Sequence, residues 1–169
     1  MKIVVVGHGG HSKVIADLIL SDEENAIVGF LDDKYVDLRL IDGVYLGPIS
    51  SAKEILNIFY DVKFVIAIGD NQIRKSIFQK LGLSINTYIS VIHKSAVVSP
   101  TAEIGYGTVI MPNSVINAES RIGHHSIINS GSVVEHDSIL GDFSHVCPGA
   151  TLTGTVYLGE GAYVGAGAT

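Results

Sequence analysis

Residues 128–151 read INSGSV VEHDSI LGDFSH VCPGAT, four consecutive groups of six residues that share one pattern. The same pattern extends from Ile92 to Thr169, where thirteen such hexads follow one another without a break. Every hexad begins with Ile, Val or Leu, and its fifth residue is Ala, Ser, Thr or Val. If aliphatic residues filled about a third of all positions, so many matching starts would arise by chance with a probability of roughly one in a million. This repeat therefore decides the fold of the second half of the chain.

The period of six predicts a solenoid of short parallel strands. It fits neither the period of an α-helix, about 3.6 residues, nor the simple alternation of a long strand, so each hexad is expected to be one short strand followed by a corner. The aliphatic residue then points inward from the strand. The small fifth residue points inward just after the corner, where a bulky side chain would not fit.

These hexads resemble those of the hexapeptide-repeat acyltransferases. In that family the strands wind as a left-handed parallel β-helix with three hexads in each coil, so the resemblance implies this fold for residues 91–169. Its left-handed crossovers are an exception to the right-handed rule for parallel connections. Family members usually continue for several more coils, whereas this chain stops within a repeat at Thr169. We therefore expect the β-helix to be truncated at its C-terminus.

The first 90 residues follow a different pattern, in which apolar strands alternate with helices. Strands are predicted at KIVVVG, AIVGFLDD and KFVIAIG. Helices are predicted over residues 13–20, 51–60 and 71–82, the second with Ser51 and Glu54 as a capping box and the third closed by Gly82. This alternation predicts a small parallel sheet, so we expect an α/β domain of the half-Rossmann type (β-α-β-α) over residues 1–90.

The composition restricts the function. With 47% hydrophobic and 17% charged residues, the chain is typical of a soluble globular protein. Its net charge of −6 argues against nucleic-acid binding, which depends on basic residues. No apolar run approaches the ~20 residues of a membrane-spanning helix, and no secretory signal precedes the first glycines. The single cysteine, Cys147, excludes an internal disulfide and suits a reducing compartment, so we expect a cytoplasmic location.

The turn GHGGHS, residues 7–12, follows the first predicted strand. It has the first two glycines of the dinucleotide-binding motif G-x-G-x-x-G, and Asp32 lies about where that motif places a ribose-binding acid. The residues before the repeats leave room for only one mononucleotide half, which favours a UDP-sugar. Glycines let a phosphate approach backbone N–H groups at a helix start, and Asp32 or Asp33 could accept from ribose or uracil. Alternatively, the glycines only shape a tight turn and the acids only end a strand.

The segment Gly69-Asp70-Asn71 ends the third predicted strand. It therefore reaches the sheet edge at which ligands collect in α/β folds. The Asp70 side chain could equally well cap the helix that follows.

The stacking of coils places the histidines of the repeat. With eighteen residues in each coil, His136 lies between Ala118 and Gly154, so its imidazole has small neighbours and could project into an open groove. A neutral His136 could take a proton from an attacking amine or hydroxyl, and Asp137 or Glu135 could raise its basicity. The alternative is a solvated corner that merely contains a histidine.

The other histidines are placed by the same subtraction: His124 beside Asp142, which suits a surface ion pair, His125 beside Phe143, which suits packing, and His145 between Ile127 and Tyr163. Nine residues separate His136 from His145, at ~3.3 Å for each residue of strand. The two side chains therefore cannot hydrogen bond to each other within one chain. A site that uses both needs two subunits.

Seven motifs run through nearly the whole chain in this order: GHGGHS, FLDD, IAIGDNQIRK, VIHKSAVVSP, IMPNSVINA, VVEHD and GDFSHV. Together they resemble the bacterial nucleotide-sugar acetyltransferases, above all the UDP-4-amino-sugar N-acetyltransferases of bacillosamine synthesis, with perosamine and sialic acid acetyltransferases as relatives. The resemblance implies an enzyme that transfers the acetyl group of acetyl-CoA directly to the amine of a UDP-4-amino-4,6-dideoxy sugar, without a metal. It also implies a homotrimer with active sites between neighbouring β-helices.

The resemblance further implies roles for single residues. His136 is the general base, and Asp137 raises its basicity. Contacts with acetyl-CoA are implied for His145, Gly154 and Ala166, and contacts with the nucleotide sugar for Gly9, Gly10, His11, Asp32, Asp33 and Gly69. Asn129 matches the family without a clear role.

Three other functions stay open. The enzyme could acetylate a hydroxyl of a sialic-acid-like sugar, or the chain could be a trimer that only binds a nucleotide sugar, if truncation removed its acetyl-CoA site. A γ-type carbonic anhydrase shares the β-helix and holds zinc with three histidines, but beyond His136 and His145 its third ligand is undefined.

The repeats have two basic residues against six acidic ones, which are few basic residues for binding the phosphates of CoA. Cys147 has only His145 as a basic partner, so we expect it to pack rather than to act as a nucleophile.

Overall fold

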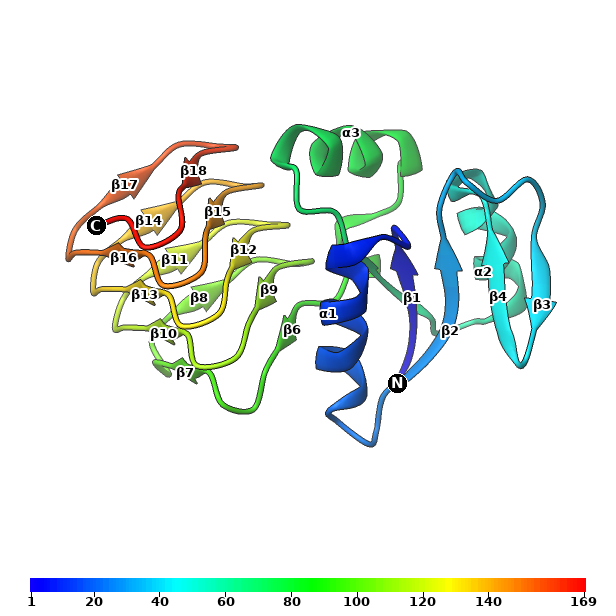
Figure 1. The fold of residues 1–169 in the computed structure, drawn as a ribbon, viewed down its shortest axis with the longest axis horizontal. Coiled ribbons are helices and arrows are strands. Elements are labelled where there is room, and N and C mark those ends of the chain that lie inside the picture. The colour runs from blue at the N-terminus through cyan, green and yellow to red at the C-terminus, as the bar shows by residue number, and fades with distance from the viewer.

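The computed structural model describes all 169 residues and shows an α/β part beside a parallel β-helix (Figure 1). The α/β part contains β1 (Lys2–Val6), α1 (Gly10–Leu20), β2 (Ala26–Leu31), β3 (Arg39–Ile41), β4 (Val44–Gly47), α2 (Ala52–Ile58), β5 (Lys63–Ile66) and α3 (Asn71–Leu81), with 3₁₀ turns at Ile49–Ser51 and Ile85–Thr87. Its sheet has the order β3-β4-β2-β1-β5, and only β3 and β4 pair antiparallel. The carboxyl ends of β1, β2 and β5 therefore meet at one edge.

The three predicted strands and three predicted helices are present, and α3 ends at Gly82 in the left-handed conformation, as expected. The hairpin of β3 and β4 was not predicted, although its turn at Asp42-Gly43 has the positive φ angles, 50° and 83°, that favour this dipeptide. The capping box at Ser51 was wrong. A 3₁₀ turn precedes α2, which leaves Ser51 at φ −75° and ψ 1° rather than in the extended conformation of a capping residue, and its side chain caps nothing.

The repeats form thirteen two-residue strands that build three sheets. One sheet faces the α/β part and is called the docked face. It contains β6 (Val91–Ile92), β9 (Val109–Ile110), β12 (Ile127–Ile128), β15 (His145–Val146) and β18 (Tyr163–Val164). The valine face contains β7 (Val97–Val98), β10 (Val115–Ile116), β13 (Val133–Val134) and β16 (Thr151–Leu152). The outer face contains β8 (Glu103–Ile104), β11 (Arg121–Ile122), β14 (Ile139–Leu140) and β17 (Tyr157–Leu158). All their pairings are parallel with a shift of eighteen residues, as in Val115 with Val133, so three hexads complete one coil.

The interior of the β-helix follows the predicted register. The aliphatic residue of each hexad points inward, and those from Ile110 to Val146 form one core. The small fifth residue is also buried in the hexads from Thr108 to Ala150, and most of the hydroxyls there donate to a corner carbonyl, as Ser132 does to Asn129 at 2.7 Å. The fourth residue of every hexad from Gly107 to Gly167 has a positive φ, which turns the chain at each corner. Asp137 occupies one of these positions, at φ 58°.

Helix α1 lies between the sheet and the docked face (Figure 1). Ile3 and Ile15 of the α/β part share one hydrophobic core with Val91, Val109 and Met111 of the first coils. Helix α3 runs beside the corners that follow the outer face. The two parts are thus joined by apolar packing at α1 and by polar contacts at α3. None of the helices is long and apolar enough to cross a membrane.

Candidate active site

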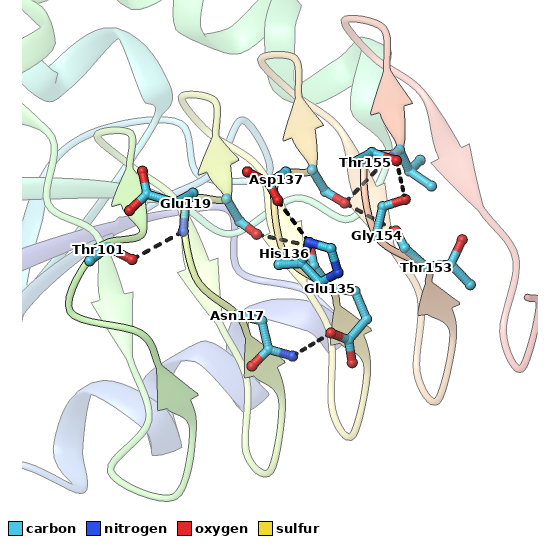
Figure 2. Close-up of polar contacts among 12 residues, drawn as sticks. Thr101, Asn117, Glu119, Glu135, His136, Asp137, Thr153, Gly154 and Thr155 are labelled. Atoms are coloured by element: carbon cyan, nitrogen blue, oxygen red, sulfur yellow. Dashed lines mark hydrogen bonds and ion pairs between the residues drawn. The ribbon is translucent and has the colours of Figure 1, made fainter.

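His136 and Asp137 form a pair at the corner between the valine face and the outer face (Figure 2). Nδ1 of His136 lies 2.7 Å from Oδ2 of Asp137, and the two side chains are 59% and 56% exposed. An ionised carboxylate accepts a hydrogen bond from Nδ1–H, so the ring proton stays on Nδ1 and the lone pair of Nε2 remains free. The corner therefore presents an accessible base whose orientation is fixed by its neighbour.

Glu135 has a different partner. Its Oε2 accepts a hydrogen bond of 2.8 Å from Nδ2 of Asn117, one coil below, and Figure 2 shows the two side chains directed towards each other. Of the two acids that could act on His136, the structure therefore pairs Asp137 with the imidazole.

Gly154 provides the space for the imidazole. A Cβ atom at Gly154 would lie 2.7 Å from Nε2 and 2.8 Å from Cε1 of His136. Backbone hydrogen bonds hold the stacked corners in register, from Asp137 N to Ala118 O at 3.0 Å and from Thr155 N to His136 O at 2.9 Å. The predicted position of His136 between Ala118 and Gly154 is confirmed.

His145 lies on the docked face and is only 7% exposed. The Nδ2 amide of Asn129 lies 3.1 Å from its Nε2, so Nε2 accepts and the ring proton is placed on Nδ1. The Tyr163 ring meets the imidazole edge-on at 5.2 Å. Burial, and next the positive charge of Arg74, lower the pKa of His145 to about 4, so the side chain is neutral at neutral pH. Asn129 thus orients His145, a role that its position in the sequence does not reveal.

The glycines at the edge of the sheet leave open space. Gly9 precedes α1 as its N-cap, Gly10 begins the helix, and Gly69 follows β5. A Cβ atom on any of the three would meet nothing within 4 Å, and none of them has a positive φ. Neither packing nor backbone conformation therefore requires glycine here, whereas the close approach of a ligand to the backbone would.

His11 lies in the first turn of α1 at the seam with the β-helix. Its Nε2 is buried without a hydrogen-bond partner, and burial lowers the pKa of this side chain. Because His11 and His145 act on each other electrostatically, the two imidazoles belong to the same seam. The structure thus brings together His11, Gly69 and His145.

The three acids near the sheet edge all have partners within the protein. Asp32 accepts from the backbone N–H groups of His8 at 2.7 Å and Lys34 at 3.0 Å. Asp33 accepts from Ile49 N at 3.0 Å and from Lys80 Nζ at 2.7 Å, and the hydrogen bond from Lys80 lowers its pKa. Asp70 accepts from Ile73 N at 2.8 Å, so it caps α3.

His8 was not singled out from the sequence. Its ring stacks on Phe30 at 4.3 Å, and its Nδ1 lies 2.6 Å from the hydroxyl of Tyr35. A small pocket beside this stack is lined by His8, Ser12, Lys13, Ala16, Asp17 and Phe30. Only its place inside the glycine-rich turn could have indicated His8.

Within one chain, the remaining predicted contacts do not form a single site. His136 and Gly154 occupy the corner before the outer face, His145 lies on the docked face, and Ala166 lies at the corner after β18. The predicted ion pair of His124 with Asp142 was wrong. Instead Asp142 Oδ1 accepts from the backbone N–H of His124 at 2.7 Å, while the imidazole accepts from Tyr106 N at 2.9 Å. No three side chains of His, Cys, Asp or Glu lie close enough together to hold a metal ion.

Residues 2–81 match the family described as the PglD N-terminal domain. The chain is also 44% identical over 108 residues to the UDP-N-acetylbacillosamine N-acetyltransferase of Bacillus subtilis (strain 168). That alignment covers 64% of this chain and 50% of the relative, so the chain spans about half the length of the curated relative.

Two solved structures are similar over almost the whole chain. A variant of the perosamine N-acetyltransferase from Caulobacter crescentus, in complex with CoA and GDP-perosamine, has a TM-score of 0.83 and 33% identity over 96% of this chain and 76% of that chain. The acetyltransferase domain of PglB from Neisseria gonorrhoeae has a TM-score of 0.82 and 34% identity over 98% and 80%. A second structure of that domain is in complex with acetyl coenzyme A. This protein therefore belongs to the PglD-like nucleotide-sugar N-acetyltransferases, whose second half is a left-handed parallel β-helix.

Proposed function

We propose that this chain transfers the acetyl group of acetyl-CoA to the amine of a nucleotide-linked amino sugar, with UDP-4-amino-4,6-dideoxy sugars as its substrate class. One observation carries the proposal. His136 holds Asp137 on Nδ1 at 2.7 Å and presents a free Nε2 at an exposed corner. This is the arrangement that a general base needs in order to deprotonate an attacking amine.

The transfer is direct. Nε2 of His136 takes a proton from the amine while the nitrogen attacks the carbonyl carbon of the thioester. The new C–N bond produces a tetrahedral oxyanion, whose collapse breaks the C–S bond. The imidazolium then returns its proton to the leaving thiolate, so the histidine is regenerated and no covalent enzyme intermediate forms. Asp137 stabilises the imidazolium between the two proton transfers.

The sugar nucleotide is proposed to bind at the carboxyl edge of the sheet. Gly9 and Gly10 allow a phosphate to approach the N–H groups at the start of α1, where the helix dipole favours a negative charge. The other proposed contacts are His11, Asp32, Asp33 and Gly69. Asp32 and Asp33 already accept hydrogen bonds from the protein, so they would offer a nucleoside only their remaining lone pairs.

The acetyl donor is proposed to bind between subunits of a homotrimer, against His145, Gly154 and Ala166. Because Gly154 lies on a different side of the β-helix from His145 and Ala166, we propose that a neighbouring β-helix completes the site. The valine face suits this contact, since Val97, Val115, Val133 and Thr151 stack outward in register. We further propose a substrate-binding domain over residues 1–90, a transfer domain over residues 91–169, and a cytoplasmic location, which the single buried Cys147 supports.

The test is an acetylation assay on purified protein with acetyl-CoA and a panel of UDP- and GDP-linked 4-amino sugars. A sialic-acid-type sugar with only hydroxyl acceptors is included. Thiol release and the mass of the product report transfer to the amine. His136→Ala is expected to lower kcat by about 100-fold or more, because it removes the base.

His93→Ala is the matched control, because His93 is half-buried and its ring bonds only Ser95. Undiminished turnover in His136→Ala would disprove the assignment of the base. Acetylation of the hydroxyl acceptor alone would support the O-acetyltransferase instead. If the protein binds a sugar nucleotide but releases no thiol from acetyl-CoA with any acceptor, it is a nucleotide-sugar-binding protein and not an acetyltransferase.

A further inference from the structure

Arg74 is the most deeply buried charged residue of the chain. It lies on α3 with 1% of its surface exposed, and its guanidinium makes six hydrogen bonds. Nε donates to His125 O at 2.7 Å, Nη1 to Ile68 O at 2.9 Å and Gly69 O at 3.1 Å, and Nη2 to Asn71 Oδ1 at 2.8 Å, Phe143 O at 2.9 Å and Ser144 O at 3.3 Å. None of these acceptors is a carboxylate.

These contacts join two parts of the proposed site. Gly69 is a proposed sugar contact, and the Phe143–Ser144 segment immediately precedes His145, a proposed donor contact. A single guanidinium therefore fixes the backbone at both. Asn71, one helical turn away from Arg74, extends the link to the next coil, because its Nδ2 donates to Gly161 O at 3.0 Å and Ala162 O at 3.1 Å.

Stability alone does not account for this arrangement. Removing a charge from water is expensive, and carbonyl dipoles compensate less fully than a paired anion would. Burial lowers the pKa of Arg74 to about 10, so the group still carries its charge at neutral pH. The fold thus maintains a positive charge at the seam between the sheet edge and the β-helix.

The positive charge of Arg74 affects the titratable groups near His145. Arg74 belongs to α3, His11 belongs to α1, and Tyr163 lies on the next coil, while Asp70, the N-cap of α3, acts on Arg74. The charge of Arg74 lowers the pKa of His11 and of His145, in both cases as the second cause after burial. The backbone of Gly69 favours the protonated imidazole of His145 but does not stand in hydrogen-bonding geometry with Nδ1, which has no partner.

We propose that Arg74 is a positioning residue for acetyl transfer, which holds the Gly69 loop and His145 in one site and places a fixed positive charge beside them. The proposal rests on the proposed function, since it assigns Arg74 to the same reaction. Arg74 does not touch the reacting atoms. It acts through His145, because it holds the backbone that precedes this residue in place to contact the acetyl donor.

The experiment compares Arg74→Met, which removes the charge, with Arg74→Lys, which keeps the charge but loses the fork of donors. Arg74→Met is expected to lower kcat by at least about tenfold through misplacement of His145. It should also raise the pH at which His145 titrates, followed by NMR of the imidazole, because a positive charge beside the ring is removed. Arg74→Lys is expected to lower kcat while the titration of His145 stays near that of the wild type.

Lys75→Met is the matched control, because it removes a neighbouring cation of α3 whose partner is the exposed Glu160. If Arg74→Met lowers only the melting temperature and leaves the titration of His145 unchanged, the residue is structural and the proposal fails. If Arg74→Met does not fold, Arg74→Lys decides, since wild-type kcat in that variant would equally overturn the proposal. The NMR titration needs no substrate, so it tests the role of Arg74 even if the protein acetylates none of the sugars. Absence of turnover in the wild type would contradict the proposed function and not the effect of Arg74 on His145.

Discussion

Gly154 and His136 share one corner of the β-helix, and the glycine determines where the imidazole lies. Gly154→Ala would put a Cβ atom 2.7 Å from Nε2 of His136. The imidazole is exposed and can move aside, so we expect little loss of stability. Displacement of Nε2 by even ~1 Å should lower kcat by about 10- to 100-fold. Steady-state kinetics and the melting temperature of the same preparation check both parts.

Gly159→Ala is the control for this prediction, because a Cβ atom there meets nothing within 4 Å and its φ is ordinary. Full activity in Gly154→Ala would show that the position of the imidazole does not limit the reaction. An equal loss in both variants would point to a general effect on the β-helix.

Single residues of the site were predictable only where the repeat fixes their neighbours. Residues that are eighteen apart in the sequence stack on each other in neighbouring coils, and this register predicted that His136 lies beside Gly154. The repeat alone left both Asp137 and Glu135 open, and only the family resemblance named Asp137, since the choice depends on the positive φ of Asp137 and on the hydrogen bond between Glu135 and Asn117. The role of Arg74 depends on where α3 docks, a long-range contact that no local pattern reports.

At the scale of elements, the hexads determined the β-helix because each one repeats the same inward aliphatic residue and the same small residue at the corner. The β3–β4 hairpin escaped prediction because its strands are short and β3 is entirely exposed, so neither has a clear apolar alternation. The predicted packing of His125 beside Phe143 is confirmed. Phe78 of α3 and Tyr88 pack against the same imidazole and complete a cluster that the sequence did not predict.

This cluster predicts that the protein becomes less stable in acid. Burial, followed by the charges of Arg74 and His124, lowers the pKa of His125 to about 3, against 6.5 in the unfolded chain. As the pH falls below about 6.5, the unfolded state binds a proton that the folded state excludes, so the free energy of unfolding decreases; above that pH the effect vanishes. His125→Phe should weaken this dependence, as measured by urea unfolding at pH 7 and pH 5.

The next coil shows that phenylalanine suits this corner, since Phe143 has the same positive φ and stacks on His125 at 5.3 Å. Some dependence on pH should remain in the variant, because burial also lowers the pKa of His145 to about 4. His93→Phe, at a half-buried histidine outside this cluster, is the control. The cluster would have no part in acid sensitivity if His125→Phe and the wild type lost the same stability between the two pH values.

For the whole molecule, the division of the proposed site over the β-helix is the feature that matters most. His136 lies before the outer face, and His145 lies on the docked face beneath the α/β part. In the proposed function a single chain binds the sugar nucleotide at the sheet edge, but the fold keeps His136 away from His145 of the same chain. Catalysis by the proposed mechanism therefore requires that one subunit supplies the base and its neighbour supplies the contacts to the donor.

Val115→Glu tests this requirement on the valine face. Val115 lies in register with Val97 and Val133, so in the proposed trimer a carboxylate there would be buried against the apolar face of a neighbouring subunit, at a cost of several kcal/mol. We expect light scattering after gel filtration to give the mass of one chain instead of three, and turnover to be lost while sugar binding remains. Ile139→Glu makes the same change on the outer face and should stay trimeric. If Ile139→Glu is monomeric while Val115→Glu remains a trimer, the subunit contact lies on the outer face instead, and the prediction is wrong.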